Sequence, residues 1–178
     1  MNPIFSIDLG ILSEMTTNEG TSLQQISNQQ PVMLFFLRHF GCTFCREALD
    51  ELAKKRKQVE ANGTKIVLVH MADDKTAVNY FKKFRLPNVA HISDLKCCFY
   101  AHFGLTKGSF AQLFGLQSFV RGFESSMIKG YGLSGPIGDG FQMPGIFLIY
   151  KGEIKESFVH KMASDRPDYL QIANCCAL

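Results

Sequence analysis

The sequence predicts an α/β fold with a central mixed β-sheet flanked by helices. Two short, predominantly apolar runs, residues 31–37 and 64–72, are typical of strands that are buried on both faces. A helical pattern separates them, so we expect a parallel pair joined by a right-handed crossover. Towards the C-terminus, the runs 145–150 and 153–160 flank Lys151-Gly152, a turn sequence that predicts a β-hairpin.

Amphipathic patterns predict the helices of the first half. The segment 21–26 favours a short helix, and residues 45–63 favour a long one. The apolar stripe of the long helix comprises Ala48, Leu49, Leu52, Ala53 and Val59. Residues 73–87 predict a second amphipathic helix, with Asp73 or Asp74 as its N-cap.

Shorter elements and one long connection complete the chain. Residues 89–93 predict a short strand, residues 94–105 a short helix, and residues 165–174 a closing helix. The segment 105–141, which has a glycine-rich end, is long for a plain connection. We interpret it as an insertion before the last hairpin, either an extension of the core or a cover for other residues.

Size and composition indicate an ordinary globular protein. The 178 residues are 46% hydrophobic and 20% charged, and we expect one domain, 1–178, with residues 1–20 as an N-terminal extension. The net charge of +3 is too small to indicate binding of nucleic acid or of an anionic membrane. No apolar run approaches the ~20 residues of a transmembrane segment, and the N-terminus shows no secretory pattern. A reducing, cytoplasmic setting is therefore expected.

Cys42 and Cys45 lie where the first strand passes into the long helix. There, unpaired N–H groups and the positive end of the helix dipole favour an anion, so we expect Cys42 to be stabilised as a thiolate. Cys45 lies one helical turn further along, where we expect deeper burial and a sulfur within reach of a disulfide. This arrangement predicts that Cys42 attacks a substrate and Cys45 resolves the product.

Two other interpretations of the cysteine pair are weaker. A zinc site would need a second cluster of ligands. The candidate histidines are scattered along the sequence, namely His39, His70, His91 and His102. The other alternative is that Cys42 and Cys45 are inert core thiols. For the vicinal pair Cys97-Cys98, the expected role is buried packing, and the functional alternative is that one of them is a relay thiol. We expect no metal and no cofactor.

Pro144 is the second signal of a redox site. It directly precedes the apolar run 145–150. A proline that opens a central strand indicates a special peptide geometry, for which a cis bond is the obvious candidate.

Together these features resemble the thioredoxin superfamily, in which a strand leads to C-x-x-C at a helix start and a proline opens the last hairpin. The closer resemblance is to the peroxiredoxin-like, AhpC/TSA-type family related to selenoprotein L. The block FFLRHFGCTFCRE, residues 35–47, carries this resemblance. HISD, FGL, GIFLIYKGEI and ASDRPD match later family blocks in order, so that the similarity covers residues 21–172.

The resemblance implies a thioredoxin-like fold with a cis-proline at Pro144 that faces the thiols. The backbone of Met143 and Pro144 would then border the substrate groove. Beside the cysteines, Arg38, His39 and Arg46 are expected to support a thiolate electrostatically. Arg46 could instead pair with a nearby acid, either Glu47 or Asp50.

The sequence departs from peroxiredoxins proper at an informative place. Their peroxidatic cysteine is preceded by Thr or Ser three residues earlier and by Pro seven residues earlier. Before Cys42 these positions hold His39 and Phe35, and before Cys45 they hold Cys42 and Arg38. The usual peroxidase constellation is therefore absent, and His39 or Arg38 would have to polarise a peroxide oxygen.

Three functions remain open on this basis. The first is a thiol–disulfide oxidoreductase of antioxidant type, which acts on a protein or small-molecule disulfide and is re-reduced by a thiol reductant such as thioredoxin or glutathione. The second is a thiol peroxidase that reduces hydrogen peroxide or organic hydroperoxides through a sulfenic acid on Cys42. The third is a non-enzymatic redox sensor or interaction module. The insertion 105–141 could cover the thiols or form a homodimer face.

Overall fold

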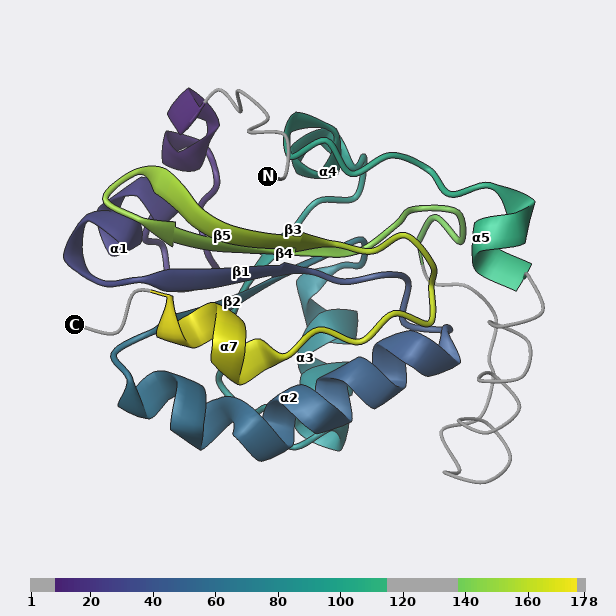
Figure 1. The fold of residues 1–178 in the computed structure, drawn as a ribbon, viewed down its shortest axis with the longest axis horizontal. Helices are drawn as coiled ribbons and strands as arrows, with labels where there is room; N and C mark the ends of the chain where they lie inside the picture. The colour runs from purple at the N-terminus through teal and green to yellow at the C-terminus, as the bar shows by residue number, and fades with distance from the viewer. Residues whose placement is uncertain (1–8, 115–137, 176–178) are drawn as a thin grey trace.

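The computed structural model describes residues 9–114 and 138–175, and it confirms the α/β architecture (Figure 1). At its centre lies a five-stranded sheet with the strand order β3-β2-β1-β4-β5. Neighbouring strands among β1, β2 and β3 are parallel, whereas β4 is antiparallel to both of its neighbours, so the sheet is mixed as predicted. The strands are β1 (Val32–Phe36), β2 (Lys65–His70), β3 (Ala90–Ser93), β4 (Gly145–Tyr150) and β5 (Glu153–Val159).

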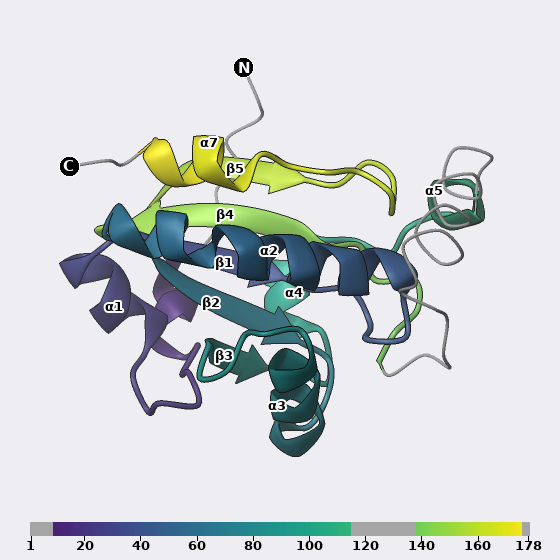
Figure 2. The same cartoon turned by 90° about the horizontal axis from the view of Figure 1, so that it is seen from below.

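Helices cover both faces of the sheet (Figures 1 and 2). One face carries α2 (Thr43–Ala61), α3 (Asp74–Lys83) and α7 (Tyr169–Asn174). The other face carries the 3-10 helix η1 (Leu9–Ser13), α1 (Leu23–Gln29) and α4 (Cys98–His102). The short helix α5 (Phe110–Phe114) lies beyond one end of the sheet, on the side where α2 begins.

The central strand β1 is buried on both sides because its side chains alternate between two cores. Met33 and Phe35 pack into the cluster beneath α2, α3 and α7. Val32, Leu34 and Phe36 pack into the cluster beneath η1, α1 and α4. This two-sided burial explains why the strand appears in the sequence as an unbroken apolar run rather than as an alternating pattern.

Local signals placed every strand to within two residues, whereas the predicted helices 94–105 and 165–174 each begin four residues later than expected, at Cys98 and Tyr169. Asp73 is the N-cap of α3, and its carboxylate accepts a hydrogen bond from the Thr76 N–H at 2.9 Å. Lys151 and Gly152 both have positive φ, 51° and 71°, as a tight two-residue hairpin requires. The long helix differs from the prediction, because it begins at Thr43 instead of residue 45. Thr43 and its neighbour Phe44 are buried, so tertiary packing supports this first half-turn.

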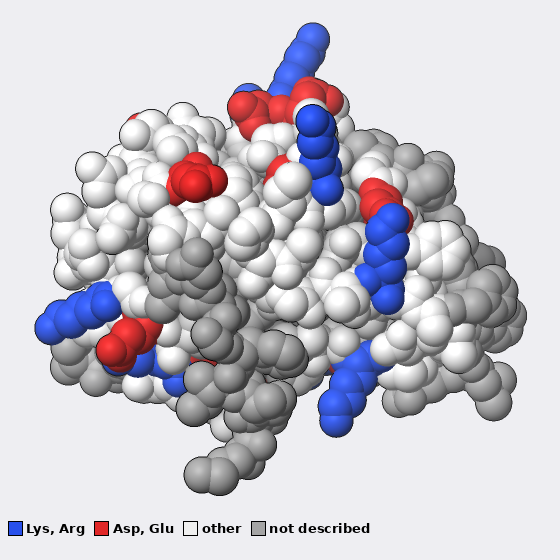
Figure 3. Space-filling view, turned by 90° about the horizontal axis from the view of Figure 1, so that it is seen from above, with Lys and Arg blue, Asp and Glu red and all other residues white. Residues whose placement is uncertain are grey.

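Part of the predicted insertion lies outside the described residues. Of residues 105–141, the structure describes 105–114 and 138–141, and of the N-terminal extension it describes residues 9–20. Among the helices that are described, none combines the length and the apolar character that crossing a membrane would require. On the face shown in Figure 3, the described charged side chains of both signs are scattered among uncharged residues.

Candidate thiol site

Cys42 and Cys45 lie at the start of α2, just beyond the end of the central strand β1. Both are free thiols, and both are buried, with 6% and 4% of their surface exposed. The sequence predicted deeper burial for Cys45, and in the structure its exposed fraction is lower than that of Cys42 only by this small amount. Both sulfur-bearing side chains belong to the core cluster that also contains Phe40 and Met143, which accounts for their similar burial.

Arg38 is the direct partner of the Cys42 sulfur. Its Nη1 donates a hydrogen bond to Cys42 Sγ at 2.8 Å, and its Nη2 donates one to the backbone carbonyl of Gly140. The arginine is only 7% exposed, so its charge acts with little screening by water. A guanidinium remains protonated in proteins, and Cys42 therefore has a permanent cation against its sulfur.

The amino end of α2 supports the same sulfur less directly than predicted. Cys42 is the N-cap residue of the helix, with φ −77° and ψ 127°, but its side chain makes no capping hydrogen bond. Its own N–H donates to the His39 carbonyl at 3.1 Å. The helix dipole still favours an anion at this end, while the specific hydrogen bond comes from Arg38.

Cys45 has a different environment in spite of similar burial. Its Sγ lies 3.4 Å from the Arg38 carbonyl oxygen, to which the S–H can donate. Burial, followed by the neighbouring Cys42, raises the pKa of the Cys45 thiol well above its ordinary value. Cys45 is therefore a protonated thiol at neutral pH.

The two other polar residues predicted to support the thiolate play unequal parts. Burial, together with the charges of Arg38 and Arg46, lowers the pKa of His39 to about 4. His39 is consequently neutral at pH 7 and does not supply the positive charge that we expected from it. Arg46 is buried, and its Nε donates to the Phe40 carbonyl at 3.1 Å, which anchors the loop between β1 and α2.

Pro144 lies beside Cys45, where the two residues line the same small cavity, but its peptide geometry differs from the prediction. No peptide bond among the described residues is cis, so the expected cis-proline is wrong for this structure. Strand β4 begins only at Gly145, so the missing N–H of Pro144 removes no bond from the sheet. The Met143 N–H donates to the Thr106 carbonyl at 3.2 Å, so this backbone donor has a partner within the chain.

The cavity beside Cys45 is small and partly polar. Its volume is about 20 Å³, and its lining includes Cys45, Arg38, Pro144, His160 and Arg166. Three of these residues contribute nitrogen atoms that are buried without a hydrogen-bond partner among the described residues: Arg38 Nε, His160 Nδ1 and Arg166 Nε. Burial lowers the pKa of His160 to about 4, so its ring is neutral. A space of this size and polarity suits one water-sized molecule.

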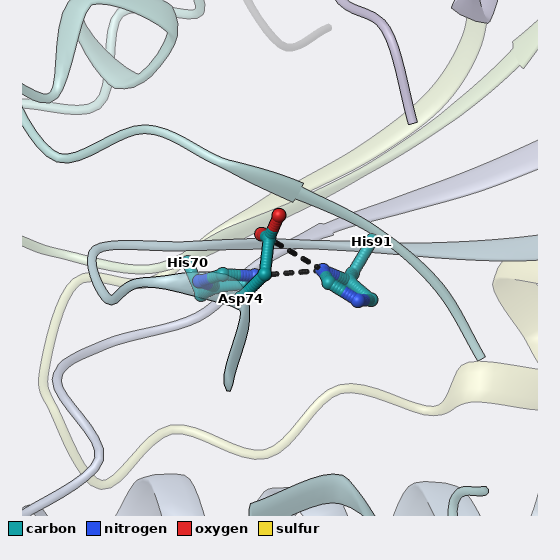
Figure 4. A group of neighbouring side chains, drawn as sticks. All are labelled: His70, Asp74 and His91. Atoms are coloured by element: carbon teal, nitrogen blue, oxygen red, sulfur yellow. Dashed lines mark hydrogen bonds and ion pairs between the residues drawn. The ribbon is translucent and has the colours of Figure 1, made fainter. Parts of the chain in front are cut away.

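Sequence reasoning missed a second polar cluster, formed by His70, Asp74 and His91 (Figure 4). Their candidate ligand atoms lie within 4.8 Å of one another. The two histidines are far apart in sequence, but β2 and β3 are parallel neighbours, with Leu68 opposite His91. Their proximity could have been found only from the order of the strands.

The geometry of the histidine pair is that of a hydrogen bond. His70 Nε2 lies 3.0 Å from His91 Nδ1, and the ring centroids are 5.1 Å apart. The Ala72 N–H donates to His70 Nδ1, which leaves the ring proton on Nε2, directed at His91. A metal ion would instead need both lone pairs to converge on one point. We therefore interpret this pair as a structural N–H···N link between β2 and β3.

The vicinal cysteines also differ from the prediction. Cys98 is exposed and Cys97 is half-buried, so buried packing is wrong for Cys98. Burial, then the nearby Asp94, raises the pKa of Cys97 to about 11. The Asp94 carboxylate accepts the N–H groups of Cys98 and Phe99, at 2.9 and 2.8 Å, and so holds the start of α4.

A mixed sheet with two thiols at the start of the helix that follows its central strand defines a thioredoxin-like thiol protein. The family model described as the AhpC/TSA family matches residues 12–157, and the chain belongs to this family.

Individual relatives agree with this assignment. Over 180 residues, the chain is 28% identical to a protein of Danio rerio named prostamide/prostaglandin F synthase, covering 97% of this chain and 87% of that one. It is 24% identical to a chloroplastic thioredoxin-like protein, AAED1, of Arabidopsis thaliana, covering 97% of this chain and 72% of that one. Among solved structures, bacterioferritin comigratory protein of Xanthomonas campestris superposes with a TM-score of 0.59, covering 85% of this chain and 83% of that one. Its 12% identity makes this a likeness of fold.

Proposed function

We propose that this protein is a thiol–disulfide oxidoreductase in which Cys42 is the nucleophile and Cys45 the resolving thiol. The observation that carries the proposal is the hydrogen bond from Arg38 to Cys42 Sγ at 2.8 Å. A fixed cation beside one sulfur favours its thiolate, which is the attacking form. The second sulfur, one helical turn away, is kept protonated by burial until it is needed. The two thiols thus differ in chemistry although both are buried.

The proposed cycle moves two electrons. The Cys42 thiolate attacks one sulfur of a substrate disulfide, forms a mixed disulfide and expels the other sulfur as a thiolate. Cys45 then loses its proton and attacks Cys42 Sγ, which releases the second substrate sulfur as a thiolate. The substrate disulfide is reduced to two thiols, and the Cys42–Cys45 pair is oxidised to a disulfide. A cellular thiol reductant, such as thioredoxin or glutathione, would restore the pair by the reverse exchange.

Reduction of insulin disulfides by the purified protein tests the proposal. The wild-type protein should catalyse the reduction, Cys42→Ser should abolish it, and Cys45→Ser should accumulate a mixed disulfide at Cys42 that mass spectrometry detects. Cys98→Ser, which changes an exposed thiol, is the matched control and should retain activity. Activity that survives Cys42→Ser would refute the assignment.

The cavity beside Cys45 favours peroxide reduction as a second candidate function. Two of its lining residues carry buried nitrogen atoms without a hydrogen-bond partner among the described residues, Arg38 Nε and His160 Nδ1, which can bind a small polar molecule. A volume of about 20 Å³ suits hydrogen peroxide better than an organic hydroperoxide. Alkyl peroxide reduction is the activity described for the Xanthomonas campestris protein of similar fold. Stopped-flow oxidation of the reduced protein by hydrogen peroxide separates the two functions, since a rate no faster than that of free cysteine would eliminate peroxidase activity.

A sensor role would give a third outcome, with slow reaction in both assays. Oxidation of the cysteine pair would then change the binding of a partner and not turn over a substrate.

The cytoplasmic location and the homodimer remain predictions from the sequence.

A further inference from the structure

The guanidinium of Arg38 is held at both of its terminal nitrogens. Nη1 contacts the Cys42 sulfur, and Nη2 donates to the Gly140 carbonyl, which belongs to a distant part of the chain. Because the guanidinium is planar and rigid, fixing one terminal nitrogen determines where the other points. The position of the Gly140 carbonyl therefore bears directly on the contact between Arg38 and Cys42.

Hydrogen bonds and one ion pair hold the segment that carries Gly140, residues 138–141. The Asp139 carboxylate accepts the Phe141 N–H at 2.8 Å, which bends the backbone around Gly140. The same carboxylate pairs with Lys107 Nζ at 2.8 Å. The Phe141 carbonyl accepts the Gly108 N–H at 2.7 Å, next to that lysine. Lys107 and Asp139 thus join the two ends of the predicted insertion at the edge of the thiol site.

The Lys107–Asp139 pair lies at the surface. The side chains are 69% and 28% exposed, and exposed ion pairs contribute little to global stability. Its expected effect is therefore local, on the conformation of residues 138–141, and a variant that breaks the pair should still fold.

We propose that the Lys107–Asp139 ion pair positions the Gly140 carbonyl and, through it, holds Arg38 against the Cys42 sulfur. Lys107 and Asp139 are positioning residues, because neither contacts the sulfur in the described structure. The inference deepens the proposed function, since it concerns how the nucleophile of that function is activated.

The sign of the mutational effects distinguishes positioning from simple electrostatics. If the two residues acted only through their charges, removing the Lys107 cation would disfavour the Cys42 thiolate, and removing the Asp139 anion would favour it. If the pair acts by positioning, both changes release the Gly140 carbonyl and weaken the contact between Arg38 and Cys42. Lys107→Gln and Asp139→Asn should then change the reactivity of Cys42 in the same direction.

The experiment measures alkylation of Cys42 by iodoacetamide in the full-length reduced protein, with mass spectrometry assigning the label to each cysteine. Lys107→Gln and Asp139→Asn should each slow labelling of Cys42 about three- to tenfold at pH 7, the range expected when one charge-assisted hydrogen bond is weakened. In both variants the pH profile of labelling should move to higher pH. Lys107→Arg, which keeps the pair, should retain the wild-type rate.

Two further variants test the same arrangement. The exchanged pair, Lys107→Asp with Asp139→Lys, should restore only part of the lost rate, because a lysine at position 139 cannot accept the Phe141 N–H. Lys54→Gln breaks a comparable exposed pair with Asp50 on α2 and should leave the rate unchanged.

Gly138 offers a route to the same effect that removes neither residue of the ion pair. Its φ is +101°, and an added Cβ would lie 2.7 Å from Met71 Cβ, so Gly138→Ala must shift the segment. This variant should slow labelling of Cys42 as well. Gly63 also has a positive φ, +77°, but has open space around it. Gly63→Ala therefore introduces similar backbone strain away from the site and should not slow the labelling of Cys42.

Faster labelling in Asp139→Asn, or unchanged labelling in both single variants, would overturn the inference. These outcomes are separate from the failure of the proposed function, because alkylation needs no substrate disulfide. If insulin reduction requires Cys42 but the rate of Cys42 labelling is unchanged in Lys107→Gln and Asp139→Asn, the proposed function is supported and the positioning role is refuted. If labelling responds as expected but no disulfide is reduced, the positioning role stands and the function fails.

Discussion

Arg38 and Cys42 form a charge-assisted contact inside the protein core, with Nη1 donating to Sγ at 2.8 Å. Burying an arginine is unfavourable unless its charge is compensated. The Cys42 sulfur and the Gly140 carbonyl supply acceptors for its two terminal nitrogens. The stability of the buried arginine and the reactivity of the cysteine are therefore linked through one hydrogen bond.

Replacing Arg38 with Met should slow the alkylation of Cys42 about 10- to 100-fold, because a hydrogen bond to a charged group contributes roughly 1.5–3 kcal/mol. Arg38→Lys should give an intermediate rate, since an ammonium keeps the charge but lacks the planar fork that reaches Gly140 as well. Iodoacetamide labelling with mass spectrometry provides the measurement. Arg85→Gln, at an exposed position, should match the wild type, and equal rates in Arg38→Met would show that the contact does not activate Cys42.

The two thiols should label at very different rates in the native protein. The raised pKa of Cys45 keeps it protonated, so at pH 8 we expect labelling of Cys45 to be at least about 100-fold slower than that of Cys42. In denaturant, where burial is lost, the two rates should converge. Preferential labelling of native Cys45 would reverse the proposed roles of nucleophile and resolving thiol.

Tyr100 should stabilise the end of β1 through its buried hydroxyl. The hydroxyl donates to the Leu37 carbonyl at 2.6 Å and lies 3.1 Å from the Val69 carbonyl, so it links β1 to β2 just before Arg38. Tyr100→Phe should lower the free energy of unfolding by about 1–3 kcal/mol, because the buried Leu37 carbonyl loses this donor, whereas the Val69 carbonyl still accepts the Leu37 N–H. Urea denaturation provides the measurement. Tyr150→Phe, in the half-buried position at the hairpin, is the control, and an equal loss there would argue against a specific role of Tyr100.

Acid should destabilise the protein through its buried histidines. In the folded state the pKa of His70 is lowered to about 3 and that of His160 to about 4, both mainly by burial, from an ordinary value of 6.5. Below pH 6.5 the unfolded chain therefore binds protons that the folded chain does not, and the free energy of unfolding falls as the pH falls towards 4. Each histidine contributes a slope of at most ~1.4 kcal/mol per pH unit.

Urea denaturation between pH 7 and 4.5 measures this slope. His160→Gln removes one of the buried groups and should make the pH dependence shallower by about one proton, whatever its effect on stability at pH 7. His102→Gln changes an exposed histidine and serves as the control. An unaltered slope in His160→Gln would show that His160 is not buried in its neutral form.

Local sequence patterns predicted most of the architecture. The unbroken apolar run of β1, the aspartate cap of α3 and the Lys151-Gly152 turn each reflect contacts within a few residues or simple burial, and each is confirmed. The position of Cys42 and Cys45 at the start of α2 follows from the same reasoning. The expected cis bond at Pro144 is wrong although β4 begins at Gly145 as predicted, and a trans proline just before the strand disrupts no strand pairing.

The environment of the thiols was decided only by tertiary structure. The sequence by itself determined that two thiols one turn apart begin a helix behind a buried strand, because helix and strand periodicity are local properties. The contact of Arg38 with Gly140 and the link between His70 and His91 depend on segments that are distant in sequence, and the neutral state of His39 depends mainly on burial. Such contacts follow from strand order and from how completely water is excluded, and neither is encoded in local periodicity.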